Sequence, residues 1–430
     1  METYYIKGHS DTRKLHEHKL VKKQKGRVSI IILVITSLVL LFEVFSGALR
    51  YYFTQWNLSF MIYLPKVICL FAVIIKVVAL KIKNLMLFAF LMLSILISLF
   101  HSATMFNIFF SIFVYCPFLF GFLYGQYLEI KRKELLIIVW ICFLSSILGV
   151  YLDYVTELPW KGFVYNIGGV EIEANRQWST LGEDRIAGFS RLSASLAFMI
   201  AIFSTYINMF LKSKFLKLFL LIVTFCSLIL TTNKTAVISY FSTSIIYFYY
   251  YERKFIKGFF FFITFFGCFL PIIGIFLDYS VDSEGFGVIS RSLLFSFDDR
   301  LTNTWPFFYQ CVRDNNGFIW GTGIGTIGSA FSSFPIRDIT TIKGYGLGVA
   351  DNTFLYLWGL FGLFGIFLYT RFYWLMNRLV KREDSFSVAL CGIVVCICII
   401  SWTTDSLEAV ISSLFLGIAS SVALRGRKNA

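Results

Sequence analysis

The sequence predicts an all-α, polytopic membrane protein with about twelve transmembrane helices and two long loops on the non-cytoplasmic side. Of its 430 residues, 57% are hydrophobic and 15% are charged, whereas a soluble domain carries about 25% charged residues. The mean hydropathy is +0.74. Phe and Tyr are abundant, at 50 and 23 residues, as expected for lipid-facing surfaces and interfacial belts.

The net charge of +14 resides in short Lys and Arg clusters that separate the apolar runs. Nucleic-acid binding needs a basic face on a soluble module, and the sequence contains no such module. Clusters of this kind set the orientation of a membrane protein instead. We therefore interpret the charge as a topology signal and expect no nucleic-acid partner.

The chain divides into a basic tail at 1–27, one transmembrane domain at 28–424 and a short tail at 425–430. Its first apolar run reaches Gly47 without a small-residue cleavage site, which indicates a retained signal anchor. A membrane span needs roughly 20 apolar residues. The candidate spans are 28–47, 58–80, 84–100, 107–129, 135–152, 188–210, 216–232, 235–251, 258–277, 350–370, 386–403 and 407–424.

Orientation follows from the basic residues, because cytoplasmic loops carry the excess of Lys and Arg. With the N-terminus inside, 26 of the 39 basic residues are cytoplasmic, 11 are exterior and two lie within the second span. Both termini are therefore expected in the cytoplasm. The long loops, about 153–187 and 278–349, then face the exterior, where 288–297 and 304–311 are expected to form amphipathic or re-entrant helices.

The cysteines and histidines argue against a disulfide framework or a metal site. Among nine cysteines, Cys311 is the one in a long loop. Cys391, Cys396 and Cys398 share one predicted helix without a nearby His, so we expect small buried hydrophobic side chains there. His101 is the one exterior His, which excludes a His-based metal site or a Ser/His/Asp triad in the long loops.

Six exterior cations stand out because the positive-inside pattern depletes Lys and Arg on that side. Guanidinium and ammonium groups at a membrane surface suit an anionic, lipid-bound ligand such as a polyprenyl pyrophosphate. The alternative is that each binds an outer-leaflet phosphate or a neighbouring carboxylate. The six are Arg185, Arg191, Lys234, Arg291, Arg300 and Arg313.

A glycine-rich stretch at 321–326 superficially matches phosphate-binding loops. It lacks the preceding strand and the surrounding soluble α/β unit that a nucleotide site needs. Its missing side chains instead let the backbone approach a ligand or another helix. Gly323, at its centre, is accordingly a candidate binding position.

A carboxylate opens the predicted span 350–370. Either Asp351 or Asn352 suits a helix N-cap, and capping alone accounts for both residues. Asp351 is also a candidate general base toward a sugar hydroxyl. The competing carboxylates are Glu183, Asp184, Asp405 and Glu408.

Two charges lie inside the predicted membrane region, Glu43 and Lys66, at similar depth below the exterior surface. We expect them to pair. Such pairs mark proton pathways in some transporters, but one pair joining the first two spans is more often structural.

The arrangement resembles the O-antigen polymerase and ligase superfamily over nearly the whole chain. The segment 185–191 looks like the family's Arg- and Gly-containing entry to a helix, and 231–236 is similar to a turn where many members have Ser-Arg. The family's carboxyl-terminal pattern of Arg, Trp, Gly-rich turn and Gly-containing helix is echoed by Arg300, Trp305, 321–326, Asp351-Asn352 and 360–365.

Two departures from the family pattern matter. Lys234 replaces the commoner Arg, which preserves charge but not bidentate geometry. The ligases usually carry His where this chain has Asp351-Asn352, which favours a polymerase over a ligase. A lipid-linked oligosaccharide flippase or other transporter is the remaining alternative, and it is disfavoured because exterior loops of transporters are short.

The resemblance implies a GT-C-like architecture in the bacterial inner membrane and a metal-independent, inverting glycosyl transfer that needs no cofactor. Growing chains on undecaprenyl pyrophosphate are joined to another lipid-linked repeat unit, in contact with membrane lipids and with a chain-length regulator as a further partner. Arg185, Lys234 and Arg300 are expected to converge on one exterior-facing cavity that binds the donor pyrophosphate. The implied catalytic residues are Asp351, Arg185 and Arg300, and the implied substrate-binding residues are Arg191, Lys234, Arg291, Arg313, Trp305 and Gly323.

Overall fold

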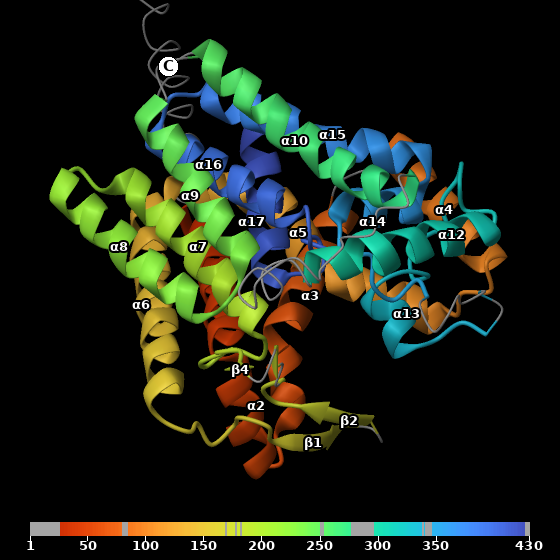
Figure 1. Ribbon diagram of the computed structural model, residues 1–430, viewed down its shortest axis with the longest axis horizontal. Coiled ribbons are helices and arrows are strands. Elements are labelled where there is room, and N and C mark those ends of the chain that lie inside the picture. The colour runs from red at the N-terminus through yellow and green to blue at the C-terminus, as the bar shows by residue number, and fades with distance from the viewer. Residues whose placement is uncertain are drawn as a thin grey trace, which may run out of the picture.

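The computed structural model describes residues 26–79, 85–167, 170–176, 179–180, 183–249, 253–276, 296–337, 339 and 346–425. Helices dominate these parts of the chain (Figure 1). In the first half they are Gly26–Val44, α2 (Ser46–Gln55), η1 (Ser59–Tyr63), α3 (Leu64–Ala79), α4 (Leu85–Phe100), α5 (Met105–Ile130), α6 (Arg132–Val155), α7 (Ser193–Phe210), α8 (Lys214–Leu230) and α9 (Lys234–Tyr249).

The second half continues the helical array before, within and after the second predicted exterior loop. Its helices are α10 (Arg253–Phe276), the π-helical turn η3 (Arg300–Thr304), α12 (Trp305–Asp314), α13 (Ser329–Ser333), α14 (Thr353–Phe361), α15 (Leu363–Val380), α16 (Ser385–Ile400) and α17 (Val410–Leu424). The described strands form two small antiparallel pairs within the first exterior loop. They are β1 (Val164–Ile167) with β2 (Val170–Glu173), and β3 (Ser179–Thr180) with β4 (Glu183–Asp184).

The membrane-protein class is confirmed, because every predicted span overlaps a helix. Among the described residues, six helices are long and apolar enough to cross a membrane. The count of twelve crossings and the GT-C-like architecture remain predictions. The six are Gly26–Val44, Ser59–Ala79, Met105–Ile130, Arg132–Val155, Ser193–Phe210 and Lys254–Phe276.

The predicted boundaries of one span, 350–370, are wrong. The chain forms two helices there, α14 and α15, which break at Gly362 with φ +58° and continue to Val380. A Cβ at Gly362 would collide with the backbone carbonyl of Ile319. The left-handed φ and this close approach both require glycine, and apolar composition alone does not reveal such a break.

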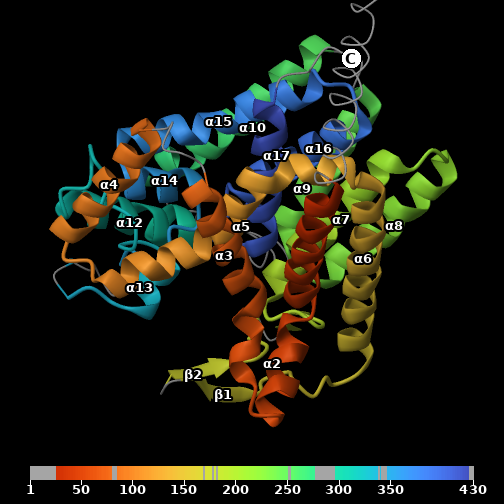
Figure 2. The same ribbon diagram turned by 180° about the vertical axis from the view of Figure 1, so that it is seen from behind.

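The helix predicted at 304–311 is confirmed by α12, whose inner face buries Trp305, Phe308 and Cys311, and its position at the membrane surface remains a prediction. The other predicted surface helix, 288–297, falls almost entirely outside the described residues. The β1–β2 hairpin and the described C-terminal end lie at opposite ends of the molecule in both views (Figures 1 and 2). This separation agrees with a first exterior loop and a cytoplasmic C-terminus, although the compartment itself remains a prediction.

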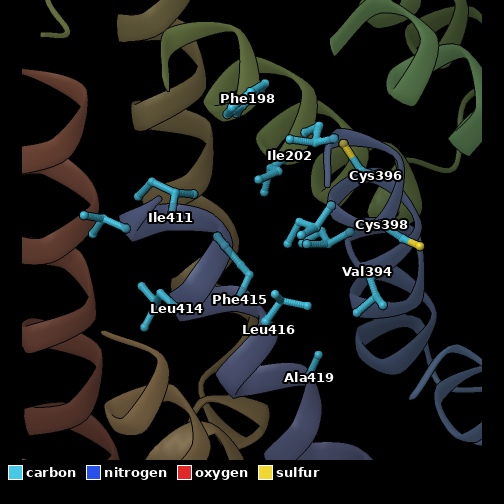
Figure 3. Close-up of a cluster of buried hydrophobic side chains, with 14 of the residues drawn as sticks. Phe198, Ile202, Val394, Cys396, Cys398, Ile411, Leu414, Phe415, Leu416 and Ala419 are labelled. Carbon is cyan, nitrogen blue, oxygen red and sulfur yellow. The ribbon is translucent and has the colours of Figure 1, made fainter. Parts of the chain in front are cut away.

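The core is centred on α16, in which every residue from Phe386 to Ile400 is buried. Figure 3 shows side chains of α7, α16 and α17 gathered in one cluster. Cys391, Cys396 and Cys398 are fully buried in this cluster, so they fill apolar space as small hydrophobic side chains, as expected.

The helices α5 and α17 pack with their backbones unusually close. A Cβ at Gly121 would lie 2.4 Å from the carbonyl oxygen of Leu414, and one at Gly125 would lie 2.7 Å from Cα of Ile418. Small residues at such crossings let helices gain dispersion contacts where no hydrophobic effect drives association in lipid. This contact fixes the middle of α17 against α5.

Candidate functional site

The segment 185–191 enters α7 through a turn that is fastened to α6. Oδ2 of Asp153, near the C-terminal end of α6, accepts hydrogen bonds from the backbone N–H groups of Ala187 (2.9 Å) and Gly188 (2.8 Å). Gly188 has φ +58°, and a Cβ there would collide with the backbone of Gly149. The turn thereby separates the side chains of Arg185 and Arg191, which interact with different residues.

Arg185, Lys234 and Arg300 lie close enough to act on one another electrostatically. Burial and the charge of Arg300 lower the pKa of Arg185. Burial, Arg185 and Arg300 lower the pKa of Lys234, the first residue of α9. The three cations, which we call the Arg185 cluster, therefore lie within electrostatic range of one another. Their predicted opening onto one exterior-facing cavity remains a prediction. Three like charges held together favour an anionic ligand.

Arg300 links this cluster to a carboxylate. Its Nε lies 3.1 Å from Oδ2 of Asp351, and its terminal nitrogen NH1 donates to the carbonyl oxygen of Ser296 (2.9 Å) and to its Oγ (2.6 Å). The side chain of Asp351 is 32% exposed. Burial raises the pKa of Asp351 although Arg300 lowers it, and Asp299 adds a smaller increase. A raised pKa suits a group that must accept a proton near neutral pH.

Asp351 sits in a strained turn that its neighbours hold. Its φ is +47°, a left-handed conformation that is uncommon for a residue other than glycine. Trp305 donates from Nε1 to the backbone carbonyl of Asp351 at 3.4 Å. Strain of this kind persists where the surroundings over-determine the conformation, and it concentrates at functional sites.

Asn352 and Thr353 supply most of that support. Oδ1 of Asn352 caps α14 by accepting the N–H of Leu355 (3.0 Å), while its Nδ2 donates to the carbonyl oxygens of Gly267 (3.1 Å) and Trp402 (2.9 Å). Thr353 N–H donates to the Ser401 carbonyl at 2.9 Å. Asn352 is thus the N-cap, and Asp351 is left with its carboxylate directed to Arg300.

The α16–α17 loop brings two further carboxylates to this turn. Burial raises the pKa of Asp405 well above its ordinary value, and the nearby Glu408 and Asp351 add to this increase. Glu408 is committed to contacts, since it accepts from Tyr356 Oη (2.7 Å) and from Ser329 Oγ (2.5 Å) and N–H (3.0 Å). Glu408 therefore has a structural role, and Asp405 is held in an environment that favours its protonated form.

The remaining predicted residues lie elsewhere or serve the packing. Trp305 is fully buried beneath Asp351. Gly323 is buried with φ +90°, and a Cβ there would collide with Ser98 of α4, so its glycine is required by packing. Arg313 is 57% exposed and pairs with Asp314 at 3.2 Å. Arg291 lies outside the described residues, as do the side chains of Glu183 and Asp184.

Several site residues were missed from the sequence. Asp153 is a carboxylate at a helix end beside the first exterior loop, which was a usable signal. Ser296 and Tyr356 gave none, because their roles depend on partners far along the chain. Arg50 is an exterior cation in the count used for orientation, but it was not considered as a ligand-binding residue.

Glu43 and Lys66, which were expected to pair, line one small pocket together with Ser46, Arg50 and Tyr63. Lys66 Nζ also lies over the ring of Phe113, 5.7 Å from its centroid. The charge of Glu43 acts on Lys66, and so do the charges of Arg50 and Arg191. Glu43 and Lys66, both among the described residues, form no ion pair within 4 Å, so the expected direct pairing is not observed, and both belong to a larger charged region.

No protein-family model, curated protein or solved structure matches this chain.

Proposed function

We propose that this protein polymerises undecaprenyl-pyrophosphate-linked oligosaccharide repeat units by inverting glycosyl transfer at the exterior face of the bacterial inner membrane. The observation that carries the proposal is the junction of the Arg185 cluster with Asp351 through Arg300. A cationic site for a diphosphate leaving group and a base for an acceptor hydroxyl are the two groups that such a transfer needs.

In the proposed reaction, the acceptor hydroxyl oxygen attacks the anomeric carbon of the donor and forms the new glycosidic bond. The hydroxyl proton passes to the carboxylate of Asp351. The bond between the anomeric carbon and the pyrophosphate oxygen breaks, and its electron pair leaves with undecaprenyl pyrophosphate. Attack opposite to the leaving group inverts the anomeric configuration.

The Arg185 cluster stabilises the leaving group. Negative charge grows on the bridging phosphate oxygen as the bond breaks, so fixed cations there bind the transition state more tightly than the ground state. Arg300 has a second effect, because its contact with Asp351 lowers the pKa that burial raises. The leaving-group site and the base are therefore coupled through one guanidinium.

The test is the length of the surface polysaccharide in a deletion strain of the source bacterium. Loss of a polymerase leaves one repeat unit on the acceptor, and complementation with the wild-type chain restores polymer. Loss of a flippase leaves none, and loss of a ligase leaves polymer on the lipid carrier. Either of these two outcomes would replace the polymerase proposal.

A further inference from the structure

A second group of cations surrounds the start of α2, which lies beside the β1–β2 hairpin in both views (Figures 1 and 2). Arg191 is partly buried, and burial and the charges of Arg50 and Arg176 lower its pKa. We call these three residues the Arg50 cluster. The charges of Arg50 and Arg191 also act on Lys66, so positive charge extends toward the membrane.

The backbone fixes this cluster as firmly as the first one. Ser46 accepts the N–H of Arg191 through its Oγ at 3.0 Å, and its carbonyl oxygen accepts a bond from NH1 of Arg50 at 2.9 Å. The N–H of Gly47 donates to the carbonyl oxygen of Phe189 at 2.8 Å, and a Cβ at Gly47 would collide with the Ser190 carbonyl. The two guanidinium groups are therefore preorganised.

Two buried guanidinium nitrogens in this cluster have no hydrogen-bond partner among the described residues. They are Nε of Arg50 and Nε of Arg191, and the buried hydroxyl of Tyr165 lies beside Arg50. Buried donors are nearly always paired, and a buried cationic donor left unpaired is costly. Two of them at one place therefore indicate a ligand that accepts hydrogen bonds and carries negative charge.

Arg50 also lines the small pocket shared with Glu43, Ser46, Tyr63 and Lys66. Its other lining residues are apolar: Val39, Phe42, Ile62, Pro65 and Val410. A polar mouth at the exterior end of two membrane helices with an apolar wall below suits a phosphate-bearing lipid better than a free ion.

The two cationic clusters are separated by the turn at Gly188, which Asp153 fastens to α6. Arg185 faces Lys234 and Arg300, whereas Arg191, six positions later, faces Arg50 and Arg176. One short segment thus contributes a guanidinium to each site. Two separate cationic groups on the same predicted side of the membrane suit two separate anionic ligands.

We propose that the Arg50 cluster binds the diphosphate of the second lipid-linked substrate, the acceptor. This inference rests on the proposed function. The donor diphosphate is attached to the reacting anomeric carbon, so it must lie beside the base, at the Arg185 cluster. The acceptor reacts through a sugar hydroxyl at the far end of its repeat unit, so its own diphosphate lies one repeat unit away from Asp351. A separate cationic site meets that requirement.

The test is a binding titration of the full chain in phosphatidylcholine nanodiscs with undecaprenyl pyrophosphate that carries no sugar. Wild type is expected to bind two equivalents. The double variant Arg50→Gln/Arg191→Gln loses one equivalent, and Lys234→Ala/Arg300→Gln loses the other. The matched control is Arg313→Gln, which removes an exterior guanidinium outside both clusters and should retain two. A second equivalent that survives Arg50→Gln/Arg191→Gln overturns the proposal.

A milder variant keeps the test independent of folding. Tyr165→Phe removes one hydroxyl and no charge, and it should weaken the second equivalent alone by about three- to tenfold. An unchanged second equivalent contradicts the site. Ordinary phospholipid is tested by adding phosphatidylglycerol in excess. If it displaces the second equivalent, the cluster binds phospholipid headgroups and the assignment to a substrate is wrong.

Turnover distinguishes this inference from the proposed function. With defined lipid-linked units, Arg50→Gln should raise the KM for the acceptor by about tenfold and leave the KM for the donor unchanged, and Arg50→Lys should recover part of the loss. A rise in donor KM instead would overturn the assignment. Two binding equivalents without any transfer would refute the polymerase and leave two diphosphate sites.

Discussion

Nε of Arg300 lies 3.1 Å from Oδ2 of Asp351, and this contact joins the cationic cluster to a candidate catalytic carboxylate. The two residues are 51 positions apart and come from different elements, the π-helical turn η3 and the turn before α14. From the sequence, helix capping alone could account for Asp351. In the structure Asn352 caps the helix instead, so capping does not explain Asp351. Its chemistry is therefore open to test.

The first prediction concerns Asp351 as the base. Asp351→Asn should abolish polymer while the protein remains abundant, because Asn is isosteric and also tolerates the left-handed φ of +47°. The measurement is polymer length together with membrane abundance in the complemented deletion strain. Normal polymer in this variant would remove Asp351 from the mechanism.

The matched control for that substitution is Asp405→Asn. Burial raises the pKa of Asp405 well above its ordinary value, which favours the neutral carboxyl, and an amide is a close replacement for that form. Asp405→Asn should therefore retain polymer. Loss of polymer in Asp405→Asn with normal polymer in Asp351→Asn would exchange the two roles.

A second prediction concerns pH. Asp351 accepts a proton only when it is ionised, and burial raises its pKa above the ordinary value of 3.8. The rate of transfer should therefore be fully developed above the raised pKa and fall as the pH is lowered through it, at a pH where an exposed Asp is still ionised. Single-turnover rates across pH measure this limb. A limb at the ordinary Asp pKa contradicts the buried base.

The third prediction concerns the Arg185 cluster. Alanine at Arg185, Lys234 or Arg300 should reduce transfer by about 10²–10³, the usual cost of removing one charge-stabilising donor, and leave mostly single-repeat product. Lys234→Arg keeps the charge with a different geometry and should retain partial function. Arg313→Gln is the control, since Arg313 is exposed and pairs with its neighbour. An equal loss in the control would point to general surface charge.

The fourth prediction concerns Asp153, which acts through the backbone of the 187–188 turn. Asp153→Ala leaves two backbone donors without their acceptor and should destabilise the protein by about 1–3 kcal/mol for each. Asp153→Asn retains an acceptor oxygen and should be milder. Because the turn positions both Arg185 and Arg191, the Ala variant should also weaken both pyrophosphate-binding equivalents, which a loss of stability alone does not do at a temperature where the variant is folded.

Sequence patterns sufficed for the helices because each apolar run is long and its ends are marked by charge. The cationic cluster was also predictable, since Arg185, Lys234 and Arg300 contradict the expected depletion of exterior cations. The features that the sequence did not predict depend on contacts between residues far apart in the chain. The break at Gly362 is set by the backbone of Ile319, and the packing of Gly323 is set by α4. Arg50 was overlooked because its significance arises from Arg191 and Tyr165, which lie more than 100 positions away.

The last prediction concerns the contact between α5 and the middle of α17. A Cβ at Gly417 would lie 2.2 Å from the carbonyl oxygen of Phe118 and 2.8 Å from the N atom of Phe122. These are backbone atoms, so the helices must separate, and Gly417→Ala should cost about 1–3 kcal/mol as overpacking does elsewhere.

The matched control for Gly417→Ala is Gly258→Ala in α10, where an added Cβ meets nothing within 4 Å. Alanine is favoured over glycine in a helix by about 1 kcal/mol, so this variant should unfold at the same or a higher temperature than wild type. Thermal unfolding of both purified variants in one detergent measures the difference. A Gly417→Ala protein as stable as Gly258→Ala would show that the two helices are not in the close contact described.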